Sequence, residues 1–330
     1  MKIPPSYTVT AEMVGLIAEI EAIRIYLVSL KPQKPIKEKI ERVNLLKSSL
    51  FSARIEGNPI ELSDLELGRQ TEQKKKKEIF NILDAAGFIE KKIKSNKITI
   101  DILLQIHECV MKDISLDAGY FRKEVSAIFN KAGVAVYMPP PPSEVSSLLN
   151  KLLVYVNLDK EKFPLVGAYV AHLVFEKIHP FLDGNGRVGR LLITAILKAR
   201  KWDVIFSIPF EEYLDIHKDE YYFYLDTGLQ KTNDYLLFML TAFLEELKKI
   251  RLQIEEEIEK KEQLFLPPRQ EEIYKIIQDH VIASFDIIRR RFLRIPERTL
   301  RYDLQKLLKL KIIEKSGETR GRYYRVRKQK

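Results

Sequence analysis

Apolar residues recur every three or four positions along most of this 330-residue chain, and this spacing restricts it to a mostly helical fold. One expected helix begins after Thr10, a suitable N-cap. The others span about residues 36–55, 62–88, 100–114, 165–178, 191–199, 218–229 and 233–261. The second helix stops before Gly57, because glycine adopts the left-handed backbone angles of a helix end at little steric cost.

Residues 120–142 break this helical period. Apolar residues there alternate with other residues on both sides of a turn-like segment, residues 130–133, and four prolines follow. The alternating residues are Val125, Ala127, Phe129, Val134, Val136 and Met138. We therefore expect a β-hairpin inserted in the helical fold.

The C-terminal part differs from the rest in charge. Residues 267–330 carry 18 Lys and Arg against 8 Asp and Glu, whereas residues 1–266 carry 38 of each, so the net charge of +10 belongs to the C-terminal part. Such a basic module favours a polyanion as its partner, with a solvated charged face as the alternative. Its pattern predicts helices at about residues 270–280, 284–292 and 296–310, followed by two short strands, which is the order of a winged helix-turn-helix.

These patterns predict four parts of the chain. They are an N-terminal helical region (1–98), a helical core with the hairpin (99–245), a charged helical linker (246–266) and a winged helix-turn-helix (267–330). The N-terminus lacks the apolar segment of a signal peptide, and no apolar run reaches the roughly 18 residues of a membrane span, so a cytoplasmic protein is expected. Cys109 is the only cysteine, which excludes a disulfide framework or a cysteine-based zinc site within one chain.

The densest chemistry lies in HPFLDGNGRVGR, residues 179–190, between two expected helices. Its glycines allow backbone N–H groups to converge on an anion, and the following helix directs its positive N-terminal end to the same point. Arg187 and Arg190 lie three positions apart, about one helical turn, so they can face the same phosphates. The segment is suited to a polyphosphate, although it does not have the P-loop pattern.

Two further side chains of this segment carry reactive groups. Asp183 is the carboxylate best placed for Mg²⁺, which takes one or two protein carboxylates together with phosphate oxygens and water. His179 can act as a general base, because imidazole titrates near neutral pH. A lone histidine at a helix end is more often a hydrogen-bonded cap, and the eleven residues that follow His179 favour the base.

The segment resembles the signature of the Fic family, HPFx[DE]GNGRxxR, and fills every defined position. The resemblance extends at lower specificity to the hairpin and prolines at 120–142, to Tyr221-Tyr222 and to Asp234, and it covers about residues 1–245. It implies a mostly helical fold with a target-binding hairpin, called the flap. It also implies a reaction in which a histidine deprotonates a Tyr, Thr or Ser of a protein, which then attacks the α-phosphate of ATP and expels pyrophosphate.

The resemblance assigns roles by position. His179 would be the base and Asp183 the metal ligand. The residues that would bind the triphosphate are Gly184, Asn185, Gly186, Arg187 and Arg190, the last at the γ-phosphate. The residues that would dock the target are Val125, Ala127 and Val136 of the flap.

A second motif, SARIEGN at residues 52–58, resembles the inhibitory signature of the same family, [ST]xxxE[GN], in its N-terminal position. The resemblance implies that Ser52 opens the signature and that Glu56 pairs with Arg190, which keeps Arg190 from the γ-phosphate. Taken alone, a Glu before a helix-ending Gly is a common solvated helix end.

The expected third helix of the C-terminal part carries polar side chains at helical spacing. The candidates for contacts with DNA phosphates or base edges are Arg298, Arg301, Gln305 and Lys309, with Arg322 from the wing. A winged helix that binds protein, or that has only a basic surface, is the alternative.

The sequence therefore predicts an autoinhibited, Mg²⁺-dependent protein adenylyltransferase that moves AMP from ATP onto a protein hydroxyl. The alternatives are a nucleotide-sensing DNA-binding regulator without transferase activity and a hydrolase that removes AMP through the same site. The expected partners are ATP, a protein substrate that can be the chain itself, and double-stranded DNA. A homodimer is compatible with the sequence, and no membrane partner is expected.

Overall fold

The computed structural model describes residues 1–32, 34–66, 72–93, 97–129, 135–158, 160–202, 207–263, 266–280, 283–316 and 323–327. The chain divides into two compact units, residues 1–255 and 256–330.

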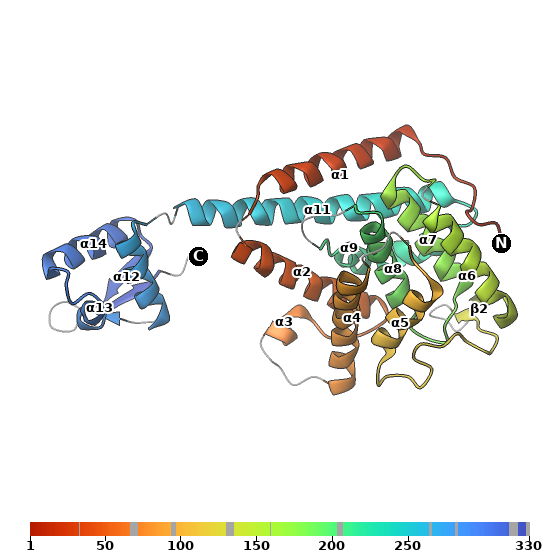
Figure 1. The fold of residues 1–330 in the computed structure, drawn as a ribbon, viewed down its shortest axis with the longest axis horizontal. Helices are drawn as coiled ribbons and strands as arrows, with labels where there is room; N and C mark the ends of the chain where they lie inside the picture. The colour runs from red at the N-terminus through yellow and green to blue at the C-terminus, as the bar shows by residue number, and fades with distance from the viewer. Residues whose placement is uncertain are drawn as a thin grey trace. The chain divides into compact units, whose positions relative to one another are not determined.

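The first unit is built mainly of helices (Figure 1). They are α1 (Ala11–Ser29), α2 (Lys34–Ile55), α3 (Leu62–Glu66), α4 (Gln73–Lys92), α5 (Ile100–Met111), α6 (Pro142–Asn157), α7 (Pro164–Ile178), α8 (Asn185–Ala199), α9 (Glu211–Ile216), α10 (Lys218–Thr227) and α11 (Thr232–Gln263), which extends past residue 255. This confirms the predicted mostly helical fold.

Helix α7 forms the centre of this unit. Nearly all of its residues are buried, because apolar residues lie on every face of the helix. Its most extensive contact is with α8. Helices α4 and α5 pack against α8, α6 packs against α7, and α2 contacts both α4 and α8 (Figure 1). The loop between α7 and α8 is therefore held between two buried helices.

Several helix boundaries differ from the sequence prediction. The single helix expected over 62–88 is wrong, because α3 ends at Glu66 and Glu72 has non-helical backbone angles (φ −56°, ψ 124°) before α4 begins. Helix α6 was not predicted, because its opening prolines were interpreted only as the end of the hairpin, although proline suits the first turn of a helix. The short helix α9 was not predicted either.

The predicted hairpin is present but shorter than expected. Strand β1 (Ile128–Phe129) pairs antiparallel with β2 (Ala135–Tyr137), with Ile128 opposite Tyr137. Val125 and Ala127 precede β1, so their assignment to a strand is wrong, and Val125 is strongly exposed. The turn residues 130–134 lie outside the described residues, as does the side chain of Val136.

The second unit contains α12 (Pro268–Asp279), β3 (Ala283–Ser284), α13 (Phe285–Arg291), α14 (Glu297–Lys309), β4 (Ile313–Ser316) and β5 (Tyr323–Val326). The three predicted helices and the C-terminal hairpin are present. Strand β3 adds to the hairpin, because Ala283 pairs with Tyr324, and gives an antiparallel sheet in the order β3-β5-β4. A small apolar core that includes Ile277, Ile288 and Leu304 lies inside this unit.

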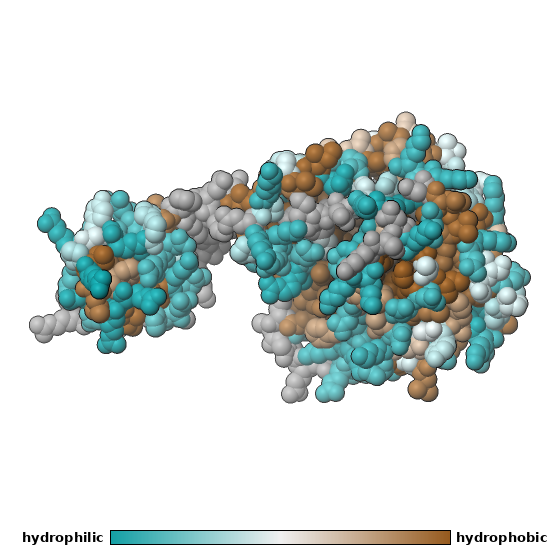
Figure 2. All heavy atoms as spheres, in the orientation of Figure 1, coloured by the Kyte–Doolittle hydropathy of each residue, from teal (hydrophilic) through white to brown (hydrophobic). Residues whose placement is uncertain are grey.

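Charged and polar residues cover much of the face shown in Figure 2, and apolar residues gather along α1. Helix α1 exposes Val14, Ile25 and Val28. None of the described helices is both long and apolar enough to cross a membrane.

Candidate active site

The loop that carries the signature lies at the junction of α7 and α8. Helix α7 ends because His179 adopts left-handed backbone angles (φ 50°), and α8 is capped by Gly184, also at positive φ (85°). A Cβ on Gly184 would lie 2.9 Å from the Met111 sulfur, so glycine is required there for space as well as for angle. Helix α8 begins at Asn185, six residues before the predicted start at residue 191. The second half of the signature is therefore the first turn and a half of a helix.

The Asn185 side chain closes the loop on itself. Its Oδ1 accepts a hydrogen bond from the Phe181 N–H at 2.9 Å, and its Nδ2 donates to the Phe181 carbonyl at 2.9 Å. Both polar atoms of this buried amide are thus used to shape the loop. Its backbone N–H, at the N-terminus of α8, is the group that can face an anion.

His107 contacts the loop through its ring and through a hydrogen bond. Its ring stacks on Phe181, with the ring centroids 3.7 Å apart. Its Nδ1 accepts from the Gly119 N–H at 2.9 Å, so Nε2 carries the proton and donates to the Asp183 carbonyl at 3.0 Å. Burial lowers the pKa of His107 to about 4, which keeps the ring neutral. The sequence gave no reason to assign His107 a function, because it lies in an apolar helical stretch. Its role follows only from its contacts with the loop in the folded chain.

Arg122 joins the loop to the segment that leads into the flap. Its guanidinium donates to the carbonyls of His179 (2.8 Å), Glu124 (3.0 Å) and Pro140, and its backbone N–H donates to the Pro180 carbonyl at 3.0 Å. The side chain is buried. The sequence analysis missed Arg122, since nothing local distinguishes it from the neighbouring surface Lys123.

His179 has the protonation state that a general base requires. Its Nδ1 lies 3.3 Å from the Glu176 carbonyl, which can only accept, so Nδ1 carries the proton and Nε2 keeps its lone pair. Burial lowers the pKa of His179, which favours the neutral ring. The residue is partly exposed, so an incoming group can reach it.

The cationic side chains of α8 take different partners. Arg187 donates to Asp183 Oδ1 at 2.8 Å, and its buried Nε has no hydrogen-bond partner among the described residues. Such an unsatisfied donor at a helix N-terminus matches an anionic ligand. Arg190 is fully buried and directed toward α2 instead.

Arg190 is held by the end of α2. Its Nε donates to Ser52 Oγ at 3.0 Å, and its Nη2 donates to the Ser52 carbonyl at 2.8 Å and to Glu56 Oε1 at 2.9 Å. Burial disfavours the charge of Arg190, but the Glu56 carboxylate together with Tyr221 and Tyr222 outweighs burial and raises the pKa of Arg190. A Cβ on Gly186 would overlap the Glu56 carboxylate, so that carboxylate lies directly against the first turn of α8. The predicted pair of Glu56 and Arg190 is therefore present.

Glu176 is a second carboxyl group near Arg190. Burial raises its pKa to about 8, so it is mainly protonated at neutral pH. Its Oε1 has no hydrogen-bond partner among the described residues and lies against Gly189, where any Cβ would overlap it. A larger residue in place of Gly189 would therefore displace the Glu176 side chain.

Asp183 is the one carboxylate of the signature, and it is exposed. Its Oδ1 accepts from the Gly184 N–H and from Arg187, and Oδ2 takes part in neither bond. Among the described residues no cluster of three His, Cys, Asp or Glu could enclose a metal ion. A single carboxylate beside a phosphate site does fit Mg²⁺, which fills its remaining positions with phosphate oxygens and water.

The other predicted site residues lie outside this cluster. The side chains of Arg298, Arg301, Gln305 and Lys309 are all exposed on α14. Arg301 pairs with Glu297 at 3.5 Å and lies over the Phe285 ring. Arg322 is outside the described residues.

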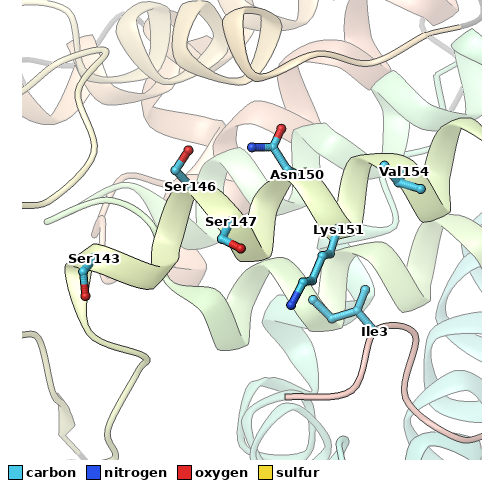
Figure 3. A pocket seen from close by; sticks show the side chains of 7 residues that line it. All are labelled: Ile3, Ser143, Ser146, Ser147, Asn150, Lys151 and Val154. Atoms are coloured by element: carbon cyan, nitrogen blue, oxygen red, sulfur yellow. The ribbon is translucent and has the colours of Figure 1, made fainter.

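A groove of about 760 Å³ lies beside α6 (Figure 3). It is lined by Ile3, Ser143, Ser146, Ser147, Asn150, Lys151 and Val154. Its polar side chains project from one exposed face of α6, and no residue of the signature lines it. It is therefore not the candidate active site.

Comparison with known proteins identifies the class of this site. Residues 97–197 match the model of the Fic/DOC family, and this range contains the hairpin and the whole signature. Residues 97–197 of the chain are therefore a Fic domain.

Two curated relatives are similar over part of the chain. A probable protein adenylyltransferase of Aquifex aeolicus is 38% identical over 96 residues, which are 29% of this chain and 28% of that protein. Protein adenylyltransferase Fic of Aedes aegypti is 32% identical over 140 residues, which are 41% of this chain and 25% of that protein. The chain thus spans about a quarter of the length of these relatives.

The fold is shared with solved structures. A Fic family protein from Desulfovibrio desulfuricans superposes with a TM-score of 0.74 at 24% identity and covers 99% of both chains. Fic-1 from C. elegans superposes with a TM-score of 0.60 at 20% identity, over 74% of this chain and 72% of that chain. These likenesses show a common fold.

Proposed function

We propose that this chain is a protein adenylyltransferase that transfers AMP from ATP to a Tyr, Thr or Ser hydroxyl of a protein. The observation that carries the proposal is the neutral His179 with an unprotonated Nε2 beside a glycine-capped helix N-terminus and the unsatisfied Nε of Arg187. A base next to an anion site is what attack of a hydroxyl on a phosphate requires.

In the proposed reaction, His179 Nε2 accepts the proton of the attacking hydroxyl. The hydroxyl oxygen forms a bond to the α-phosphorus, and the bond from that phosphorus to the pyrophosphate oxygen breaks. The backbone N–H groups of Asn185 and Gly186 and the Arg187 guanidinium stabilise the charge of the triphosphate. Arg122 keeps the flap segment against the loop, which aligns the acceptor with the base.

Mg²⁺ would be held by Asp183, where it would neutralise phosphate charge. The pairing of Asp183 with Arg187 holds this carboxylate at the start of α8. The site contains no other exposed carboxylate of the signature, so Asp183→Ala is the variant that tests the proposed ligand.

Inhibition by Glu56 is part of the same proposal. Its carboxylate occupies the space over Gly186 and uses the guanidinium that would otherwise bind the γ-phosphate. Two anions cannot share that position, because their repulsion in a partly buried site is large. ATP would bind productively only after Glu56 moves.

Transfer of α-labelled AMP separates this function from its alternatives. The full-length chain is incubated with Mg²⁺, α-labelled ATP and host lysate, beside the His179→Ala variant. Covalent label on a polypeptide that depends on His179 supports a transferase. ATP binding without label would instead support a nucleotide sensor, and loss of AMP from a previously labelled protein would support a hydrolase.

A second candidate function, DNA binding, belongs to residues 267–330. The order of α12, α13, α14 and the β4-β5 hairpin is that of a winged helix-turn-helix, in which the third helix enters the major groove. The proposal is favoured by the exposed row of Arg298, Arg301, Gln305 and Lys309 on α14 and by the concentration of net positive charge in this part of the chain.

A further inference from the structure

Two consecutive tyrosines of α10 contact opposite halves of the Glu56–Arg190 pair. Tyr221 is fully buried, and its hydroxyl lies within reach of the Arg190 guanidinium, which favours the ionised form of the tyrosine. Tyr222 is partly exposed, and its hydroxyl donates to the Ile55 carbonyl at 3.0 Å, one residue before Glu56. Neighbouring residues on one helix thus contact the inhibited cation and the segment that inhibits it.

Tyr221 belongs to a buried chain of hydrogen bonds. Its hydroxyl lies 3.2 Å from His172 Nε2, and His172 Nδ1 lies 2.6 Å from the Tyr235 hydroxyl. A guanidinium only donates, so the Tyr221 oxygen accepts from Arg190 and its hydrogen goes to His172 Nε2. His172 then donates from Nδ1 to Tyr235. Burial lowers the pKa of His172 to about 3, so the imidazole in this series of hydrogen bonds is neutral.

These hydrogen bonds orient Arg190 independently of Glu56. Tyr221, His172 and Tyr235 are all buried on α10, α7 and α11, which are not part of the inhibitory helix. When Glu56 moves away, Arg190 loses a carboxylate but keeps Tyr221. A buried cation that retains one fixed partner stays in place for an incoming phosphate.

The end of α2 has its own set of contacts with α9 and α10. Besides the bond from Tyr222, Lys218 Nζ donates to the Arg54 carbonyl at 3.2 Å, and the Arg54 side chain pairs with Asp215 at 2.9 Å. The carbonyls at a helix C-terminus lack partners within the helix, so these donors stabilise the end that carries Glu56.

We propose that Tyr221 is a positioning residue for Arg190, that Tyr222 is a positioning residue for Glu56, and that removal of the two hydroxyls changes AMP transfer in opposite directions. The inference rests on the proposed function above, which it deepens. Loss of the Tyr222 hydroxyl frees the inhibitory segment, whereas loss of the Tyr221 hydroxyl leaves Arg190 without its permanent partner.

The experiment uses the full-length chain and the same substitution at both positions. AMP transfer from α-labelled ATP is measured for Tyr221→Phe and Tyr222→Phe, each alone and combined with Glu56→Gly. Tyr222→Phe should raise transfer about threefold or more in the chain with Glu56, because one net hydrogen bond contributes that much, and should add nothing to Glu56→Gly. Tyr221→Phe should lower the transfer of the Glu56→Gly variant about tenfold. Tyr224→Phe, on the same helix, is the matched control, since its ring stacks on Phe238.

A binding measurement makes the test independent of transfer. In the Glu56→Gly background, Tyr221→Phe should weaken ATP binding and leave ADP binding unchanged, because Arg190 faces only the γ-phosphate. Unchanged ADP binding also shows that the variant is folded. Equal losses for ATP and ADP, or activation by Tyr222→Phe that persists without Glu56, would overturn the proposal. If Glu56→Gly transfers no AMP at all, the proposed function fails, and the comparison of ATP with ADP still decides the role of Tyr221.

Discussion

Glu56 and Arg190, separated by 134 positions in the chain, are joined by a hydrogen bond of 2.9 Å in a site where Arg190 is only 1% exposed. A buried guanidinium is stabilised most by an anion, so the partner that replaces Glu56 should also be an anion. In the proposed function that partner is the γ-phosphate of ATP.

Replacing Glu56 should therefore activate the protein. Glu56→Gly removes the competing carboxylate, which has a high effective concentration because it belongs to the same chain. We expect at least about a tenfold rise in AMP incorporation, measured with α-labelled ATP on the chain itself and on lysate proteins. Adding Arg190→Ala should abolish the gain. An unchanged rate in Glu56→Gly, with His179→Ala inactive, would leave the transferase proposal intact and refute the inhibitory role.

Replacing His179 should stop transfer and leave nucleotide binding intact. A positioned general base contributes about 10² to 10⁴-fold, so His179→Ala should lose that factor in the single-turnover rate while the dissociation constant for ATP stays the same. His280→Ala, at the exposed end of α12, is the control. Near-normal transfer by His179→Ala would contradict the mechanism.

The pH dependence of AMP transfer should follow the protonation of His179. Burial lowers the pKa of His179, so its neutral, proton-accepting form persists to lower pH than that of an exposed histidine. Transfer by Glu56→Gly should therefore fall only below the usual histidine range, as pH decreases through the lowered pKa. A rate that declines already above about pH 6.5, the ordinary histidine pKa, would contradict this assignment.

Glu176 should make the first unit less stable as pH rises. Its pKa is raised from 4.5 to about 8, so between these values the folded chain binds more protons than the unfolded chain. The resulting stabilisation is complete at low pH and is lost as pH rises through the folded pKa, at up to about 1.4 kcal/mol per pH unit. Glu176→Gln should flatten the pH dependence of the free energy of unfolding, measured with urea, whereas the exposed Glu12→Gln should not. If the pH dependence of Glu176→Gln runs parallel to that of the wild type, the Glu176 carboxyl is ionised in the folded protein.

Charge reversal on α14 should weaken DNA binding and its dependence on salt. If Arg298 and Lys309 each contact a phosphate, the variant with both residues changed to Glu should reduce the slope of log affinity against log salt by about two. Lys275→Glu, on α12, is the control. Fluorescence anisotropy with a labelled duplex measures both slopes, and identical slopes for the wild type and the α14 variant would exclude α14 as the contact surface.

Local sequence was enough where the chemistry depends on adjacent residues. The signature at 179–190 predicts a base, an anion site and a metal ligand together, because a tight loop before a helix brings neighbours in sequence to one point. Helical periodicity predicted most helices for the same reason, since burial of one face repeats every three or four residues. It did not predict α6, whose prolines were interpreted only as a loop.

Tertiary structure alone decided which distant groups support that loop. Local sequence gives no sign of the contacts of His107, Arg122 and Tyr221, and each acquires its role because packing places it against Asp183, His179 or Arg190. Nothing in the local sequence distinguishes Glu176 as a protonated carboxyl either, because that state results from removal of water by surrounding helices. The sequence by itself determined the reactive groups and their order along the loop. Their protonation states and the orientation of Arg190 depend on burial and on hydrogen bonds between helices, which exist only in the folded chain.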